Sequence, residues 1–426
     1  MDAPIATPPA PFRRVFQAGM RDGGGRLLSG TEVLHLVPHR GRLFSSLSYT
    51  HNRYLPGDPP VGAQIAVLDR ADGEWRQAHE YDRDYWRVLL KSVAFTEDGR
   101  GRTLDAPVSL LLAGPSNSQG AVYVDCFDDE TGTWARTRLG VGSGLTSTRS
   151  FFVHRDTVTG QERVFAGTLP LGIFSGSYDP DAPGKIRWDE HAELSGYRRR
   201  PMAFTQCDGH LYVSIRPHLY RRIDGPAPRW EKVHTIADPL IFPSCGYRGL
   251  TAVAHPSGSG QVLLAALEGD RCRIVRIDPR DDFRETLELD VLDFLGMHWG
   301  KRPAFGVVAY DDFTPVVDPG TGQALLLAGV GASYSTRVDI HPTDEWVRDA
   351  WYLIRDPGGR RHTLGRIETA DLEPPAALFA ARSFAASPFE PGTLYVGGCD
   401  PNNQPCRETA WVFSAPVETV LAPRTR

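Results

Sequence analysis

Basic side chains recur along the chain at one position, at the start of a repeated group of short apolar segments. They are Lys91, Arg149, Arg200, Arg248, Arg302 and Arg382. The corresponding position in the first group holds Glu32. Guanidinium groups stay charged and offer several donors, so a ring of them would bind a carboxylate, a phosphate or a phenolate. The alternative is that each arginine pairs with an acid of a neighbouring repeat and only ties the repeats together.

Candidate acid–base residues fall in loops that we predict to lie on the same face of the molecule. A histidine titrates near neutral pH, with an ordinary pKa of about 6.5, and a carboxylate can take the same role when its surroundings suit. The candidates for catalysis are His51, His218, Glu268, His298 and Tyr334, and Trp299 is the aromatic candidate for substrate binding. A single loop histidine is more often an ordinary surface residue, so this prediction rests on the group.

Short β-strands must position these residues. The stretch 200–235 shows the pattern best, because it holds four short strand-like segments with a Cys207-Asp208-Gly209 turn between the first two. Comparable groups occupy 32–82, 91–140, 149–194, 248–291 and 302–372, and a three-strand group follows Arg382. Apolar segments at such regular spacing, with Gly, Pro and Asp between them, are typical of a β-propeller.

The predicted fold is therefore all-β: a single domain, 1–426, forming a seven-bladed β-propeller with four-stranded antiparallel blades. The last group lacks its outer strand, and the segment 11–19 near the N-terminus reads well as one. We expect this N-terminal strand to complete the last blade, which would remove an open sheet edge. Two long loops, 291–301 and 331–348, are expected on one face, either as functional loops or as tolerated insertions.

Composition excludes several classes of function. The net charge of −5 and the pI near 6.2 argue against a general nucleic-acid binder, which needs a basic surface. No apolar run is long enough for a membrane helix, and the first residues lack the apolar core of a secretory signal, so we expect a cytoplasmic protein with no membrane partner. The six cysteines form no CxxC pair, with a Cys399–Cys406 bridge as the alternative to free thiols.

No metal site and no cofactor is predicted. Propellers that hold iron use histidines at the inner positions, where this chain has Arg and Lys. The acidic turns at 128–130 and 179–181 leave calcium as a weaker alternative to ordinary solvated turns. Neither a nucleophile elbow nor a phosphate-binding loop is present in the sequence.

Two stretches carry a resemblance to a known group of proteins: GTLPLGIFSGSYDP, residues 167–180, and LYVGGCDPNNQP, residues 394–405. They are similar to segments of divergent bacterial seven-bladed propeller proteins. This resemblance implies the fold only, because propellers host many unrelated functions. Some propellers of specialised metabolism join an aromatic substrate to an alkyl electrophile with Arg, Asp and Tyr side chains, and here they serve as an analogy.

The function predicted from these observations is small-molecule binding at the mouth of the central channel. The protein would be an enzyme of bacterial specialised metabolism that acts on an anionic or phenolic aromatic substrate. Two alternatives stay open. One is a protein-interaction scaffold with an exposed apolar patch around Phe242, Trp299 and Trp346. The other is a metal-dependent hydrolase resembling lactonases or glycosidases, which needs a central metal or a close pair of carboxylates.

Overall fold

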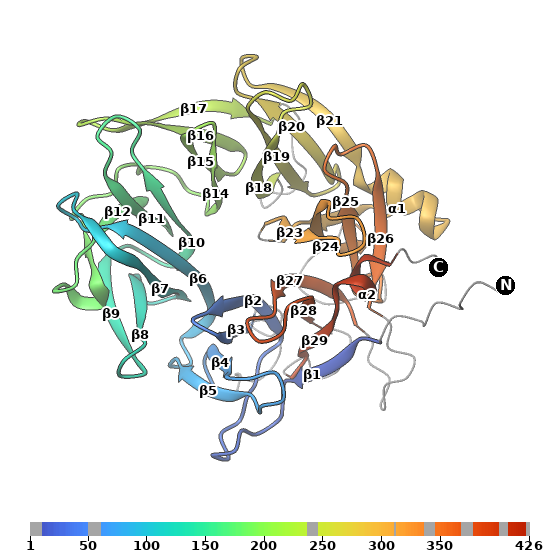
Figure 1. Cartoon of the computed structure of the whole chain (residues 1–426), viewed down its shortest axis with the longest axis horizontal. Coiled ribbons are helices and arrows are strands. Elements are labelled where there is room, and N and C mark those ends of the chain that lie inside the picture. Colours follow the sequence, from blue (N-terminus) through green and yellow to red (C-terminus); the bar gives the residue numbers. More distant parts are fainter. Residues whose placement is uncertain are drawn as a thin grey trace.

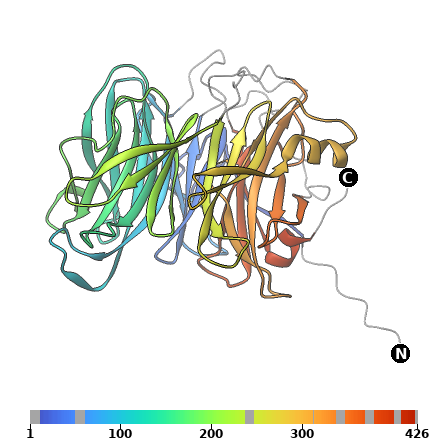
Figure 2. The same cartoon turned by 90° about the horizontal axis from the view of Figure 1, so that it is seen from above.

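The computed structural model describes residues 11–49, 61–236, 246–310, 312–335, 346–367, 378–399 and 408–422. This part of the chain is mostly antiparallel β-strand, with two short α-helices, α1 and α2. The sheets stand side by side around a central axis, as the blades of a propeller do (Figure 1). Seen from the side, the strands run roughly along that axis between two faces (Figure 2). The molecule is thus an all-β protein of the propeller type.

Three of the sheets contain four strands each, joined in chain order by antiparallel pairing. The first comprises β2 (Glu32–His39), β3 (Arg42–Ser48), β4 (Gln64–Leu68) and β5 (Arg76–Glu80). Another comprises β14 (Pro201–Cys207), β15 (His210–Ile215), β16 (His218–Ile223) and β17 (Arg229–Thr235). The third comprises β18 (Gly246–Ala254), β19 (Gln261–Glu268), β20 (Arg273–Asp278) and β21 (Arg284–Asp290). In each sheet the first strand lies nearest the axis (Figure 1).

An eight-stranded sheet arises where β7 also pairs with β10. Its strands are β6 (Tyr85–Glu97), β7 (Thr103–Asn117), β8 (Ala121–Asp128), β9 (Thr133–Val141), β10 (Thr146–Arg155), β11 (Glu162–Leu169), β12 (Ile173–Tyr178) and β13 (Ile186–Trp188). β6 and β10 are its two strands nearest the axis (Figure 1).

A nine-stranded sheet arises where β25 pairs with β27. Its strands are β22 (Phe305–Val308), β23 (Thr314–Val317), β24 (Ala324–Ser333), β25 (Trp351–Arg355), β26 (His362–Arg366), β27 (Ala380–Ala386), β28 (Thr393–Cys399), β29 (Ala410–Pro416) and β1 (Arg13–Gln17). β1 comes from the N-terminal part of the chain and pairs antiparallel with β29, which precedes α2 (Val417–Leu421). Because the sheets merge in this way, the number of seven blades stays a prediction.

Apolar side chains fill the space between neighbouring sheets. All five residues of β4 are buried, and seven of the eight residues of β19 are buried, because both faces of each sheet are covered by other sheets. Aromatic residues at the outer strands add to these interfaces: the ring centroids of Trp75 and Phe16 are 5.6 Å apart, and those of Trp134 and Phe127 are 5.1 Å apart. The frame that carries the inner strands is therefore closely packed.

The predicted long loop 291–301 is wrong in its conformation, because α1 occupies Val291–Trp299. Asp290 caps the helix by accepting a hydrogen bond from the Asp293 backbone N–H, and Gly300 ends it in the left-handed conformation. Val291, Leu292 and Leu295 are buried against the sheets beneath. α1 lies on the outer side of the ring (Figure 1). The second predicted loop, 331–348, is described only at its ends, and β24 extends into it as far as Ser333.

No helix among the residues that the structure describes is long and apolar enough to cross a membrane.

Candidate functional site

Six arginines, on or beside strands of four different sheets, come together near the axis. We call them the arginine cluster; its members are Arg87, Arg149, Arg200, Arg216, Arg248 and Arg382. Their proximity follows from the electrostatic effect that the other members have on the pKa values of Arg87 and Arg200. Arg87 is influenced by Arg149, Arg248 and Arg382, and Arg200 by Arg87, Arg149, Arg216 and Arg248. Charges from sheets all around the ring thus converge on one small region.

Irregularities in the inner strands accompany these arginines. The pairing of β10 with β11 skips Arg149, that of β27 with β28 skips Arg382, and that of β18 with β19 skips Arg248 and Gly249. A β-bulge of this kind redirects the side chain of the extra residue and bends the strand. In β6 the corresponding irregularity precedes Arg87 by one residue. The same backbone device therefore accompanies arginine in four inner strands.

Glu268 fixes two members of the arginine cluster. Its Oε1 lies 2.7 Å from Nη2 of Arg216, and its Oε2 lies 3.0 Å from Nη1 of Arg248. Each guanidinium also donates through Nε to a backbone carbonyl, Arg216 to Tyr247 at 2.8 Å and Arg248 to Tyr310 at 2.6 Å. The Glu268 carboxylate is buried, so these charge-assisted bonds hold both guanidinium planes in fixed positions.

A second carboxylate, Glu32, binds Nη1 of Arg382 inside the ring. Arg382 and Arg248 both lie over the ring of Tyr310, with their guanidinium carbons 4.5 Å and 5.3 Å from its centroid. Burial raises the pKa of the Tyr310 hydroxyl well above its usual value, so this group stays protonated at neutral pH. This side of the arginine cluster is thus held by two carboxylates and a neutral phenol.

Arg200 differs from these residues. It forms no ion pair and no hydrogen bond with any residue that the structure describes. Burial, followed by the charges of four neighbouring arginines, holds its pKa well below the usual value. The same two causes lower the pKa of Arg87 to about 10, although Glu32 opposes the shift. Both side chains are largely enclosed by protein and only partly exposed to solvent.

The structure brings four of the six predicted basic residues together and separates the other two. Arg149, Arg200, Arg248 and Arg382 belong to the arginine cluster. Lys91 lies four residues along β6 from Arg87 and is exposed. Arg302 follows α1 and binds Asp293, with its Nε 2.5 Å from Oδ1 of that residue. Since α1 lies on the outer side of the ring, Arg302 is outside the cluster (Figure 1).

Three other predicted site residues also lie at or beside α1. Trp299 is buried, with its ring centroid 5.7 Å from that of Trp351, and so serves the core and not a pocket. His298 is exposed and its Nδ1 lies 2.9 Å from the carbonyl oxygen of Phe294, one turn earlier in the helix. The ring of Tyr334 packs against Nζ of Lys301, 4.4 Å from its centroid. None of these three contacts involves the arginine cluster.

The structure places Glu268 and His218, two of the remaining candidates for catalysis, in different surroundings. Glu268 lies within the site, but both its oxygens are bound to guanidinium groups. His218 is in β16, where its Nδ1 lies 2.9 Å from Oγ1 of Thr235, and burial lowers its pKa. His51 lies outside the described residues.

Arg87, Arg216 and Tyr310 are site residues that the sequence analysis missed. Arg87 was overlooked because β6 begins at Tyr85, well before the apolar segment that was expected to start at Ser92. Comparing β6 with β10 would have found it, because Arg87 is the third residue of β6 and Arg149 is the fourth of β10. Arg216 follows β15 and had no counterpart in the repeat pattern. Tyr310 follows β22 and likewise had no repeat signal.

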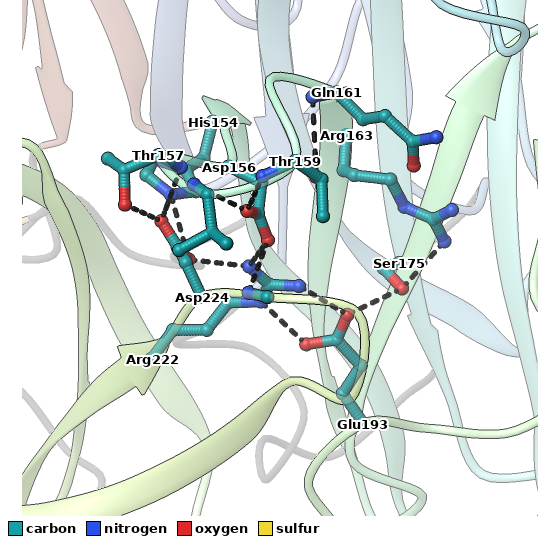
Figure 3. A network of polar contacts seen from close by, with 12 residues as sticks. His154, Asp156, Thr157, Thr159, Gln161, Arg163, Ser175, Glu193, Arg222 and Asp224 are labelled. Atoms are coloured by element: carbon teal, nitrogen blue, oxygen red, sulfur yellow. Dashed lines mark hydrogen bonds and ion pairs between the residues drawn. The ribbon is translucent and has the colours of Figure 1, made fainter.

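Another group of charged residues lies between β10 and β16, and its members form ion pairs with one another. The guanidinium of Arg222 lies 2.9 Å from Oδ2 of Asp156, 2.6 Å from Oδ1 of Asp224 and 2.9 Å from Oε2 of Glu193 (Figure 3). Asp224 also binds Nε2 of His154 at 3.0 Å. Each of the three carboxylates contacts the Arg222 guanidinium, so this network ties two neighbouring sheets together.

A histidine–aspartate pair of the same kind recurs in other sheets. Nε2 of His39 lies 2.9 Å from Oδ2 of Asp129, and Nε2 of His255 lies 3.1 Å from Oδ2 of Asp278. Nδ1 of His39 also meets Oγ of Ser92 at 2.9 Å, which resembles a Ser-His-Asp triad. We interpret it as one more structural tie, because Asp129 is shared with two arginines and the histidine is buried.

The acidic turns considered for calcium are occupied by protein groups. Asp129 binds Arg42, and Asp179 binds Arg187 and accepts from the backbone N–H of Asp181. Within the described residues no group of three or more His, Cys, Asp or Glu side chains is arranged to hold a metal ion.

No family model matches this chain, and no curated protein matches it. Solved structures resemble it weakly. One is a mutant Trypanosoma rangeli sialidase displaying trans-sialidase activity, with a TM-score of 0.41 and 12% identity over 97% of this chain and 60% of that one. The chain thus spans about 60% of the length of the sialidase. Another is Saccharomyces cerevisiae Sqt1, with a TM-score of 0.46 and 9% identity over 98% of this chain and 87% of that one. At these scores the likeness supports no argument about function.

Proposed function

We propose that the protein binds a small anionic ligand at the arginine cluster, at the mouth of the channel of a seven-bladed propeller. Arg200 carries the proposal: its guanidinium is enclosed among other arginines and has no ion pair or hydrogen bond with a described residue. Holding like charges together in an enclosed region raises the free energy of the empty protein. An anion that accepts hydrogen bonds from Arg200 and its neighbours would relieve this cost.

The enzymatic part of the proposal concerns an anionic or phenolic aromatic substrate of cytoplasmic, bacterial specialised metabolism. In it the arginines bind the substrate anion and stabilise negative charge that develops during the reaction. Glu268 acts as a positioning residue, since both its oxygens are already bound to Arg216 and Arg248. His218 remains the candidate for proton transfer.

Two alternatives have weaker physical support. A protein-interaction scaffold was expected to expose Trp299 and Trp346, yet Trp299 is buried and Trp346 packs edge-on against Phe379 with centroids 4.7 Å apart. A central divalent cation would be repelled by the arginine cluster, which disfavours a metal-dependent hydrolase.

Calorimetric titration with phosphate and with 4-hydroxybenzoate, at low salt, tests the proposal. Substituting Arg200→Met should weaken binding of the anion at least tenfold. Arg199→Met is the matched control, because Arg199 is the adjacent arginine and is exposed. Equal affinity of the wild-type protein and Arg200→Met for every anion that binds would refute the proposal.

A further inference from the structure

One tyrosine, Tyr310, supports two arginines that come from different sheets. The guanidinium carbon of Arg382, in β27, lies 4.5 Å from the centroid of its ring, and that of Arg248, in β18, lies 5.3 Å from the same centroid. Nε of Arg248 also donates a hydrogen bond to the Tyr310 carbonyl oxygen at 2.6 Å. Because β18 and β27 belong to separate sheets, a single residue contributes to the relative position of two guanidinium groups.

The backbone around Tyr310 is shaped to admit this ring. Ala309, the residue before it, has a φ of 49°, in the left-handed region that residues with a side chain rarely adopt. A Cβ added at Gly249, beside Arg248, would lie 2.8 Å from the Cβ of Ala309, so glycine is needed for β18 to approach this closely. A Cβ added at Gly331, in β24, would lie 2.0 Å from the Tyr310 hydroxyl oxygen. One strained residue and two glycines thus place the ring.

The hydroxyl and the ring of Tyr310 have separate surroundings. The hydroxyl lies against Gly331, whereas the two guanidinium groups lie over the ring, whose π-electrons attract a cation. Arginine side chains are long and flexible, and each loses rotamer freedom when it binds a ligand. A ring that holds Arg248 and Arg382 in place beforehand lowers this entropic cost. The bonds of Arg248 to Glu268 and to the Tyr310 carbonyl use Nη1 and Nε, which leaves Nη2 as a donor for a ligand.

We infer that Tyr310 is a positioning residue of the anion site: it holds Arg248 and Arg382 in the orientation that binds the ligand. Gly331 makes this position of the ring possible. The inference rests on the proposed function and adds to it two residues that need not contact the anion. Backbone strain such as that at Ala309 costs stability and is found mainly at functional sites, where a fixed geometry serves binding.

Four variants test the inference by calorimetric titration with phosphate, at low salt and at a temperature where all of them are folded. Tyr310→Phe keeps the ring and should bind phosphate within about twofold of the wild-type affinity. Tyr310→Leu removes the ring and should weaken binding about tenfold. Gly331→Ala displaces the hydroxyl and should weaken binding by a similar factor. The double variant Gly331→Ala/Tyr310→Phe should recover most of the affinity, because the nearest remaining ring atom, Cζ, lies 3.2 Å from the new Cβ.

Gly358→Ala, in the β25–β26 turn, is the matched control, because its new Cβ would meet no heavy atom closer than 3.8 Å. If Tyr310 only packs in the core, Tyr310→Leu and Gly331→Ala will lower the Tm and leave the phosphate affinity of the folded protein unchanged, which would overturn the inference. A double variant that binds no better than Gly331→Ala would overturn it as well. If Gly331→Ala does not fold, the comparison of Tyr310→Leu with Tyr310→Phe decides.

The outcomes also separate this inference from the proposed function. Weakened phosphate binding in Arg200→Met, with wild-type affinity in every Tyr310 and Gly331 variant, would keep the anion site and exclude Tyr310 from it. Absence of phosphate and 4-hydroxybenzoate binding in the wild-type protein would overturn both proposals.

Discussion

The guanidinium of Arg382 binds the carboxylate of Glu32, although the two residues lie 350 positions apart in the chain. Glu32 is the first residue of β2, and Arg382 is the bulged residue of β27. β2 and β27 pack beside each other, so the ion pair joins an early sheet to a late one. It therefore serves two purposes: it connects two sheets and removes part of the positive charge near the axis.

Substituting Glu32→Gln should destabilise the fold. The side chains of Glu32 and Arg382 are 0% and 6% exposed, so the variant removes a buried negative charge that binds this guanidinium. Breaking a buried pair by removing one partner costs about 3–5 kcal/mol. Urea unfolding followed by circular dichroism measures the change. The double variant Glu32→Gln/Arg382→Met should recover much of the loss, and a double variant no more stable than the single one would show that the pair is not the cause.

Substituting Arg200→Met should instead increase the stability of the fold. It removes a charge that is surrounded by other arginines and keeps most of the aliphatic side chain. We expect the unliganded protein to gain about 1 kcal/mol of stability, as occurs when strain at a functional site is removed. Differential scanning calorimetry without added anion measures the shift in Tm, with Arg199→Met as the control. A lowered Tm for Arg200→Met alone would indicate that Arg200 supports the fold.

The repeat pattern of the sequence predicted the short strands well but located only part of the site. Apolar segments and turn residues mark strands locally, so the β-rich fold follows from the chain itself. The position of an arginine relative to the axis depends on where its strand begins and where a bulge falls. These features depend on pairing between distant strands, which explains why Lys91 was chosen in place of Arg87. Arg216 comes from a turn, and no repeat marks it.

The prediction for α1 failed for a different reason. Its signals are present in the sequence: Asp290 before it, Gly300 after it, and apolar residues at 291, 292, 295 and 299 on one face. In a chain of short strands, the sequence pattern predicts a loop for this nine-residue segment. As a result Trp299 and Arg302 were assigned to the site, although the helix carries them to the outer side of the ring (Figure 1).

His39 should make stability depend on pH. Burial lowers its pKa below 6.5, although Asp129 opposes the shift; Arg40 and Arg42 also face it and lower it further. As the pH falls below about 6.5 the unfolded chain takes up the proton first, so stability is lost as the pH decreases. His39→Gln should therefore lose less stability than the wild-type protein between pH 7 and pH 5.

Urea unfolding at the two pH values tests this expectation, with His210→Gln as the control because His210 is exposed. An unchanged pH dependence in His39→Gln would show that this histidine does not contribute. Burial also lowers the pKa of His79, His218 and His234, so part of the pH dependence should remain in the variant.

Arg222 provides the sharpest contrast with Arg200. Both are arginines deep in the molecule, but Arg222 is bound to Asp156, Asp224 and Glu193, and its pKa is raised mainly by these partners against the effect of burial (Figure 3). Substituting Arg222→Met would leave three carboxylates facing one another without a cation. We expect a loss of about 3–5 kcal/mol, because an uncompensated buried charge is costly.

The same variant should leave anion binding intact, because the ion pairs of Arg222 are with Asp156, Glu193 and Asp224 and not with the arginine cluster. The measurement is a pair of experiments on Arg222→Met and Arg200→Met: thermal unfolding without ligand, and titration with phosphate at a temperature where both are folded. Loss of stability with retained binding in the first variant, and increased stability with weakened binding in the second, would separate the two roles of arginine. If both variants lost stability and binding together, the arginine cluster would be a structural tie like the network around Arg222, and the anion site would have no support.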